Sequence, residues 1–173
     1  RLPKTLHRTA IRLLSIFGDW DGRIKHHWTG DKLKLNIFRH RGYWWKGRRR
    51  EHETVRAIYR LVQEGDSVIE LGGHIGYLSQ IFAKLAGPNG RLHVFEPSKS
   101  NLSYLIPNLL PFANSKIVEQ AVSDHVGEVV FYEEGLTGQN NSIVQDYDVF
   151  EQNRDFSGLK VEMHETRVQC NTL

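Results

Sequence analysis

This chain of 173 residues has a single cysteine, which excludes a domain held together by disulfides and a zinc domain built on paired cysteines. A single cysteine, Cys170, cannot form an internal disulfide, and no paired-cysteine zinc pattern is present. Both observations favour a reducing, cytoplasmic setting. The nine histidines, including His26 and His27, show no spacing that requires a metal ion, so we expect none.

Long hydrophobic runs are also missing. The longest apolar stretch near the start, IRLLSIFG, is too short to span a bilayer or to serve as a signal peptide, so we expect no transmembrane segment. The composition, 39% hydrophobic and 25% charged, is typical of one globular domain. The chain starts with Arg and ends in VQCNTL, a pattern typical of a strand interior, so we expect a piece of a longer protein.

Positive charge is concentrated in the first part of the chain. Residues 1–60 hold 16 Lys or Arg against 5 Asp or Glu, whereas residues 61–173 hold 7 against 15. Within this basic part, residues 1–17 have the apolar spacing of an amphipathic helix with a basic face. Such a helix either packs on the domain or contacts an anionic lipid or nucleic acid, and the sequence leaves both open.

Residues 31–50 predict a β-hairpin. Leu33, Leu35 and Ile37 alternate with polar residues, and a turn leads into the aromatic run YWW. These aromatics either seal one edge of a core or stack on the bases of a nucleic acid. We therefore assign residues 1–50 to a basic N-terminal extension made of a helix and a β-hairpin.

Strands and helices alternate in the remainder of the chain. SVIEL, RLHVFE and KIVEQAVS predict three strands separated by two amphipathic helices, of which the second should kink or end early at Pro107. EVVFYEE and RVQCNTL predict a further strand pair, with a polar loop or lid from Gly135 to Gly158 between them. This alternation predicts an α/β fold with a parallel sheet and right-handed crossovers.

The segment VIELGGHIGY is the strand-to-helix turn at which an open α/β sheet binds its ligand. Gly72, Gly73 and Gly76 lack a Cβ, so the backbone can bend sharply and approach a ligand closely. A dinucleotide fingerprint aligned on the last two of these would need glycine where Leu71 stands, which disfavours a nicotinamide cofactor. Glu70 would repel a pyrophosphate and attract an amine or a sulfonium.

Glu96 ends the second predicted strand, twenty residues after Gly76. A carboxylate in this position can accept hydrogen bonds from the hydroxyls of an adenosine ribose. Ser98 follows as a natural N-cap for the next helix. Glu70 and Glu96 are either solvated strand ends or, as their spacing favours, two acids that point into one crevice.

At these residues the sequence resembles the FkbM family of S-adenosylmethionine-dependent methyltransferases. The resemblance runs from about Glu51 to Val130 through EGDSVIELGGHIGYLS, RLHVFEPSKSNLSYL and IVEQAVSDHVGEVVFYE, with a weaker echo in NNSIV and RVQCNTL. It implies a Rossmann-like class I methyltransferase sheet, truncated after the third core strand and a β-hairpin insertion. Residues 51–173 would then form the N-terminal part of that methyltransferase domain.

The resemblance also implies S-adenosyl-L-methionine as cofactor and assigns residues to its parts. The predicted cofactor-binding set is Glu70, Gly72, Gly73, His74, Gly76, Tyr77, Glu96, Pro97, Ser98, Ala121, Val122 and Ser123. The glycine turn would line the methionine part, Glu96 would hold the ribose, and Ala121 to Ser123 would lie near the adenine. The family more often has alanine and asparagine where this chain has Gly73 and His74. This histidine could contact the cofactor, act as a base or be structural.

The activity that the resemblance implies is O-methylation of a hydroxyl on a sugar, glycan or secondary metabolite. The family's fourth core strand lies beyond this chain, so we expect the chain alone to be inactive, and no catalytic residue is assigned. Two alternatives remain open. One is a protein that binds nucleic acid or another anionic polymer or surface through residues 1–60, and the other is an NAD-linked oxidoreductase.

Overall fold

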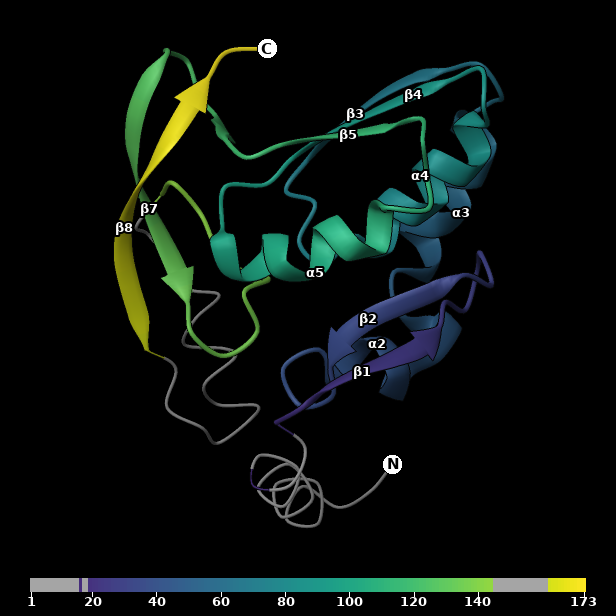
Figure 1. Ribbon diagram of the computed structural model, residues 1–173, viewed down its shortest axis with the longest axis horizontal. Helices are drawn as coiled ribbons and strands as arrows, with labels where there is room; N and C mark the ends of the chain where they lie inside the picture. The colour runs from purple at the N-terminus through teal and green to yellow at the C-terminus, as the bar shows by residue number, and fades with distance from the viewer. Residues whose placement is uncertain (1–15, 17–18, 145–161) are drawn as a thin grey trace.

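The computed structural model describes residues 16, 19–144 and 162–173 of an α/β protein (Figure 1). Its centre is a parallel sheet with the strand order β3-β4-β5. The strands are β3 (Ser67–Leu71), β4 (Arg91–Phe95) and β5 (Ser115–Val118). The predicted parallel α/β sheet is therefore confirmed, whereas the helix predicted over residues 1–17 falls outside the described residues apart from Ile16.

Two helices connect these strands and cover one face of the sheet. They are α4 (Tyr77–Ala86) and α5 (Lys99–Leu109). The buried cluster between sheet and helices consists of Ala83, Leu92, Val94, Leu102, Leu105 and Leu109. Alternate residues of β4 and every third or fourth residue of α5 thus meet, as strand and helix periodicity require. Each buried leucine contributes about 1.5–3 kcal/mol to stability.

The other face of the parallel sheet lies open in the described structure. Ile69 and Leu71 of β3 are 56% and 54% exposed, so the described residues cover them only in part. β3 is also the edge strand of its sheet. The exposed apolar side chains therefore lie on the same strand whose edge no described strand pairs with.

Pro107 does not end α5 early, although an early end was one of the two outcomes predicted for it, the other being a kink. The helix continues to Leu109 with the proline inside it. The lost backbone hydrogen bond would have gone to the carbonyl of Ser103, on an exposed residue where water can replace it. The buried Asn108 favours the helical path, because its side-chain amide bonds the carbonyls of Lys34 and Ile75 at 2.8 and 2.7 Å.

The segment KIVEQAVS forms two strands rather than the single one predicted. After β5 the chain leaves the parallel sheet, and β6 (Ala121–Val122) pairs with β8 (Met163–Asn171). The last contact of the parallel sheet is the hydrogen bond from the Glu96 amide to the Val118 carbonyl, 3.0 Å long. The break places β6 beside the carboxyl end of β4, where a ligand can lie between them.

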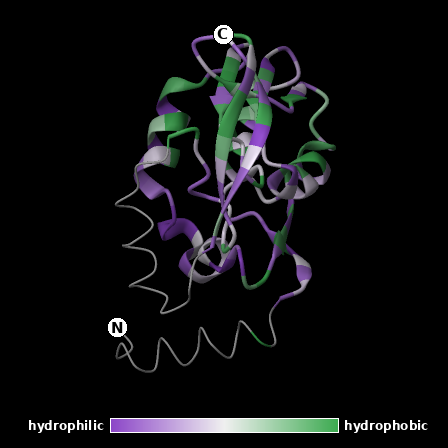
Figure 2. Cartoon of the chain, turned by 90° about the vertical axis from the view of Figure 1, so that its left-hand side faces the viewer, coloured by the Kyte–Doolittle hydropathy of each residue, from purple (hydrophilic) through white to green (hydrophobic). Residues whose placement is uncertain are grey.

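A long antiparallel pair completes the second part of the fold. β7 (Gly127–Glu134) pairs with β8 along its whole length, in a sheet with the order β6-β8-β7. The predicted pairing of EVVFYEE with RVQCNTL is thus confirmed. Figure 2 shows these two strands facing the viewer, with hydrophobic and hydrophilic residues mixed in the half nearest the C-terminus and mostly hydrophilic residues in the other half.

The prediction of a hairpin over residues 31–50 is wrong. β2 (Lys32–Asn36) instead pairs antiparallel with the preceding strand, β1 (Asp21–Lys25), and the aromatic run lies in helix α2 (Arg41–Lys46). Helical geometry buries Tyr43 to 5% exposure. Short apolar runs fit a strand or a helix equally, so the packing of this side chain decided between them.

A short 3-10 turn, η1 (Gly47–Arg49), and helix α3 (His52–Leu61) lead from α2 into β3. The N-terminal elements share a buried cluster with the glycine turn, made of Leu33, Leu35, Tyr43, Ile75 and Tyr77. The domain boundary predicted at residue 50 stays a prediction. Within the described ranges, no helix is long and apolar enough to cross a membrane.

Candidate functional site

The turn after β3 adopts a backbone that favours glycine at several positions. Gly72, His74 and Gly76 have φ values of 81°, 48° and 85°. The amides of Gly72 and Gly73 donate to the Phe95 carbonyl at the end of β4, at 2.9 and 3.2 Å. For a histidine the left-handed region costs about 1–2 kcal/mol, so other contacts must hold this residue in place.

Glu96 supplies the first of these contacts. Its side chain is buried, and Oε2 accepts the His74 amide at 2.7 Å. Oε1 accepts the Ser98 amide at 2.9 Å and the Asn101 side-chain amide at 3.3 Å. Burial raises the pKa of Glu96, and these three hydrogen bonds oppose that rise. The carboxyl group thereby joins the turn after β3 to the N-terminus of α5.

The His74 ring supplies two further contacts. Nε2 lies 3.0 Å from the Thr137 carbonyl, which can only accept, so Nε2 carries the proton. Nδ1 then accepts from the Tyr43 hydroxyl, also at 3.0 Å. Burial lowers the pKa of His74 to about 4, and the nearby charge of Arg50 lowers it as well, against the raising effect of the Thr137 bond. This neutral ring suits a positioning contact better than a general base near pH 7.

A cavity of about 260 Å³ opens at the carboxyl ends of β3 and β4. Half of the twelve predicted cofactor-binding residues line it, namely Gly72, His74, Glu96, Pro97, Ala121 and Val122. The residues were predicted from three separate sequence blocks, and the fold brings these six together. Their binding role remains a proposal, since the cavity shows only where they lie.

The other six predicted residues lie outside the cavity wall, namely Glu70, Gly73, Gly76, Tyr77, Ser98 and Ser123. Ser98 caps α5, with Oγ accepting the Asn101 amide at 3.4 Å. Ser123 donates its amide to the Asn171 carbonyl. Tyr77 is buried, and its ring stacks on His26 with centroids 4.2 Å apart.

Gly73 contributes through packing. A Cβ at this position would lie 2.3 Å from Cγ1 of Val94 and 3.0 Å from Cδ2 of Leu105. Real Cβ atoms do not approach carbon this closely. The missing side chain therefore allows the turn to lie directly on β4 and α5.

Glu70 lies inside the protein, whereas the sequence led us to expect it to face a ligand. It is 9% exposed, and its Oε2 has no hydrogen-bond partner in the described part of the chain. Burial raises the pKa of Glu70 to about 8, the Ser79 hydroxyl opposes this rise, and the charge of Glu96 adds to it. A carboxyl group that is mostly protonated at neutral pH attracts an ammonium group only weakly.

We expect Glu70→Gln to change how stability depends on pH. The folded pKa of about 8 exceeds the ordinary value of 4.5, so the folded state binds more protons between these pH values. The contribution of Glu70 to stability therefore falls as pH rises through this window, by up to about 1.4 kcal/mol per pH unit. The buried His26, His40 and His74, whose pKa values are lowered to about 4, 3 and 4, act in the opposite direction below pH 6.5, so the test compares each variant with the wild type at the same pH. By urea unfolding, Glu70→Gln should gain stability relative to the wild type between pH 5 and pH 8, whereas the exposed-site control Glu64→Gln should keep a constant difference from it. A constant difference for Glu70→Gln as well would contradict a buried, protonated Glu70.

The sequence reasoning missed one wall of the cavity. Gly138, Gln139, Asn141, Ser142 and Ile143 line it from the connection after β7. The weak echo of the family in NNSIV was the available signal, and the segment was predicted only as a loop or lid. Five lining residues outside this loop were also missed, namely Leu71, Phe95, Asn101, Gln120 and Phe131.

Hydrogen bonds join this loop to the rest of the site. The Asn101 amide donates to the Gly138 carbonyl at 3.1 Å, beside the His74 bond to Thr137. The buried Glu134 accepts from the amides of Leu136 and Thr137 at 3.1 and 2.9 Å. These hydrogen bonds attach the cavity wall to α5, to the glycine turn and to the end of β7.

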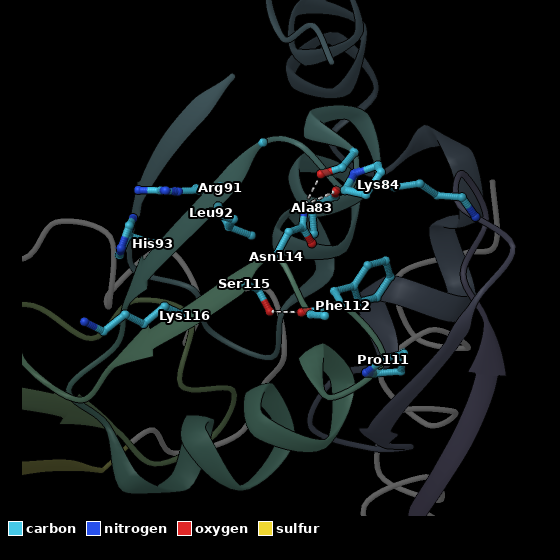
Figure 3. A pocket seen from close by; sticks show the side chains of 14 residues that line it. Ala83, Lys84, Arg91, Leu92, His93, Pro111, Phe112, Asn114, Ser115 and Lys116 are labelled. Carbon is cyan, nitrogen blue, oxygen red and sulfur yellow. Dashed lines mark hydrogen bonds between the residues drawn. The ribbon is translucent and has the colours of Figure 1, made fainter. Parts of the chain in front are cut away.

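A larger cavity, of about 630 Å³, lies at the amino ends of β4 and β5 (Figure 3). Arg91, His93 and Lys116 extend to one side of the strands, and Phe112 lies on the other side. Ligands of open α/β sheets bind outside the carboxyl ends of the strands. The smaller cavity, which holds the glycine turn, is therefore the candidate site. In the described ranges no group of three or more His, Cys, Asp or Glu residues is placed to hold a metal ion.

Comparison with known proteins gives limited similarity. No family model and no curated protein matches this chain. Among solved structures, a chain from Clostridium thermocellum assigned as an rRNA methylase is 22% identical, with a TM-score of 0.39. A SAM-dependent methyltransferase from Aquifex aeolicus is 16% identical, with a TM-score of 0.34. Fibrillarin from Aeropyrum pernix, solved with natively bound S-adenosyl-L-methionine, is 19% identical, with a TM-score of 0.36.

These similarities cover only part of each protein. They span 40%, 39% and 40% of this chain, and 39%, 36% and 32% of the three solved chains respectively. The chain thus matches about two-fifths or less of each of those proteins. TM-scores below 0.5 carry no functional weight, so the function proposed below is supported by the site geometry and the sequence motifs.

Proposed function

We propose that this chain contains the cofactor-binding half of an S-adenosylmethionine-dependent methyltransferase. The observation that carries the proposal is the position of Glu96, buried at the end of β4 on the wall of the cavity. A carboxylate offers about four acceptor positions, and the three protein donors leave room for a ribose hydroxyl. An acid in this position is typical of nucleoside recognition in such sheets.

The remaining wall suits an adenine ring. Val122, Phe131 and Ile143 offer apolar side chains around the cavity, next to the carboxamide groups of Gln120 and Asn141. Apolar walls with a few polar groups are the usual composition of a cofactor site. The missing first glycine of the dinucleotide fingerprint favours this cofactor over NAD.

Bound S-adenosylmethionine would supply an electrophilic methyl group on a sulfonium. The residues described here would bind the adenosine part, orient the cofactor through the glycine turn and exclude water from the cavity. These roles belong to Glu96, Gly72 and the Gly138–Ile143 wall. The remainder of the parent protein would place the acceptor in line with the methyl group.

We further propose the acceptor class from the resemblance to the FkbM family. The reaction would be O-methylation of a sugar, glycan or secondary metabolite, in a cytoplasmic setting consistent with the lone Cys170. Lys46, Arg48 and Arg49 are exposed on α2 and η1, which supports contact with an anionic polymer acceptor. Methyl label from S-adenosylmethionine should reach an acidic glycan with the full-length protein, and less of it in 0.2 M salt. Label on protein or nitrogen acceptors alone would contradict this acceptor class.

Calorimetry of the longest expressible protein that contains this chain tests the cofactor. S-adenosylhomocysteine, the product form of the cofactor, should bind at least tenfold more tightly than NAD. Tighter binding of NAD would restore the oxidoreductase alternative. A folded protein that binds neither ligand would contradict the proposed function.

A further inference from the structure

A further cavity, of about 250 Å³, lies where the first turn of α5 meets the end of β7 and the loop that follows it (Figure 1). Polar side chains from α5, β7, β8 and the turn before α2 make up most of its wall, and we call it the polar cavity. Asn101 and Gly138 border both this space and the proposed cofactor cavity, and the hydrogen bond between them is part of the wall between the two. The polar cavity is therefore a separate space beside the proposed cofactor site.

His40 offers the polar cavity a neutral N–H donor. The residue is 2% exposed, and its Nδ1 accepts the Asn36 amide at 2.9 Å. Burial lowers the pKa of His40 to about 3, and the charges of His74 and Arg39 lower it further. The ring is therefore neutral and carries its proton on Nε2, which has no hydrogen-bond partner in the described part of the chain. Buried polar groups are nearly always hydrogen-bonded, so an acceptor is expected beside this N–H group.

Glu133 offers the polar cavity an acceptor that lacks a partner. Its Oε1 is buried, and neither carboxylate oxygen takes part in a hydrogen bond or an ion pair with any described residue. The neighbouring Glu134 differs, because its two oxygens accept from the amides of Leu136 and Thr137 and from the Thr137 hydroxyl. Glu133 is therefore the carboxylate of this wall whose acceptor positions are free for a ligand.

The charges around the polar cavity favour a neutral ligand with hydroxyl groups. The side chain of Arg39 is 45% exposed, and its Nε already lies 4.0 Å from a carboxylate oxygen of Asp19. Glu133 would repel a carboxylate ligand, and an ammonium group, which only donates, would leave the N–H of His40 without an acceptor. A hydroxyl group both donates and accepts, so several hydroxyls on one ligand can satisfy both side chains.

We propose that the polar cavity binds one ring of a neutral sugar, with His40 donating to one ring hydroxyl and Glu133 accepting from another. A rigid ring presents its hydroxyls at a lower entropic cost than a flexible polyol does. The volume suits a small ligand, since drug-sized molecules occupy roughly 300–1,000 Å³. This inference goes beyond the proposed function, because the sugar would bind beside the cofactor cavity and needs no cofactor.

An NMR titration of the longest expressible protein that contains this chain tests the sugar site. The probes are the methyl glycosides of glucose, galactose and mannose. At least one of them should bind with a dissociation constant in the millimolar range, and at least fivefold more tightly than its amino-sugar and uronic-acid counterparts. No variant is needed for this comparison, so it is independent of any loss of folding.

Two variants test the proposed contacts. His40→Asn should weaken sugar binding at least fivefold, because the asparagine Oδ1 can replace Nδ1 as acceptor for the Asn36 amide whereas nothing reaches the position of Nε2. Glu133→Gln should weaken it at least threefold, because the charge of the acceptor is lost. Glu165→Gln, at an exposed position of β8 outside the cavity wall, is the matched control and should leave the affinity unchanged.

Competition separates the sugar site from the proposed cofactor site. A saturating concentration of S-adenosylhomocysteine should leave the sugar bound. The sugar site would be overturned by displacement of the sugar, by equal or tighter binding of a charged counterpart, by unchanged affinity in both His40→Asn and Glu133→Gln, or by a wild-type protein that binds none of the three glycosides at about 50 mM. A protein that binds the sugar but not S-adenosylhomocysteine would contradict the proposed function and leave this inference standing.

Discussion

Glu96→Gln is expected to weaken S-adenosylhomocysteine binding at least tenfold and to lower the free energy of unfolding by about 2 kcal/mol. The carboxylate accepts the amides of His74 and Ser98 and the side chain of Asn101. Glutamine replaces one acceptor oxygen by a donor, so at least one buried N–H group then faces another donor. Each such group costs about 1–3 kcal/mol. Calorimetry and urea unfolding measure the two losses separately.

A ligand lacking one hydroxyl separates recognition of the ribose from general damage to the site. Wild type should prefer S-adenosylhomocysteine to its 2′-deoxy or 3′-deoxy analogue, and Glu96→Gln should lose that preference. The exposed neighbour Glu119 supplies the control, because Glu119→Gln should keep both affinity and preference. Loss of stability with the hydroxyl preference retained for both analogues would show that Glu96 only supports the turn.

Gly73→Ala is expected to lower the free energy of unfolding by about 3 kcal/mol, a value typical of overpacking a rigid core. The new methyl would lie 2.3 Å from Cγ1 of Val94. Valine has a single preferred rotamer in most settings and belongs to the buried cluster, so it cannot turn aside at low cost. The backbone of the turn must move instead, and with it the amide that Glu96 accepts. Urea unfolding measures the loss.

The double variant Gly73→Ala, Val94→Ala provides the control. Val94→Ala alone leaves a cavity and should cost about 1–3 kcal/mol. In the double variant the added methyl occupies part of that space, so the total loss should be at least 1 kcal/mol smaller than the sum. Additive losses would contradict a steric role for the missing side chain of Gly73.

The sequence was most informative where local chemistry allows few solutions. Three glycines in six residues between a strand and a helix predict a sharp turn. Gly72 and Gly76 have positive φ values, which glycine adopts more readily than other residues. The sequence also predicted that Glu96 ends the second strand, and the structure places it just beyond the last residue pair of β3 and β4, Leu71 with Phe95. The next residue along β4 therefore lies just beyond the sheet.

Glu70 shows why strand parity must be considered together with register. It pairs with Val94, one position inside the end of the sheet, and shares its face with the partly buried Val68. Side chains two residues apart on a strand point the same way, so Glu70 points into the layer covered by α4. The position of Glu70 near the end of a strand suggested a ligand contact. The sequence of one strand, however, gives neither its register with the neighbouring strand nor the helix that covers its face.

Tertiary context decided the elements that the sequence misassigned. Tyr43 lies in a helix because its ring fits against Tyr77. KIVEQAVS breaks because β8 offers β6 a partner, with Cys170 opposite Ala121. In each case the deciding neighbour is distant in the sequence.

Among the described residues no strand pairs with the outer edge of β3, which bears on how this chain behaves in solution at high concentration. Its backbone N–H and C=O groups form a row that another extended strand can join, and Ile69 and Leu71 offer that strand an apolar surface. Lys, Pro and β-bulges are the usual protection of such edges, and SVIEL contains none of them. We expect two copies of the chain to self-associate by pairing their β3 strands edge to edge. A charged residue in place of Ile69 would be the simplest means of keeping the chain dispersed.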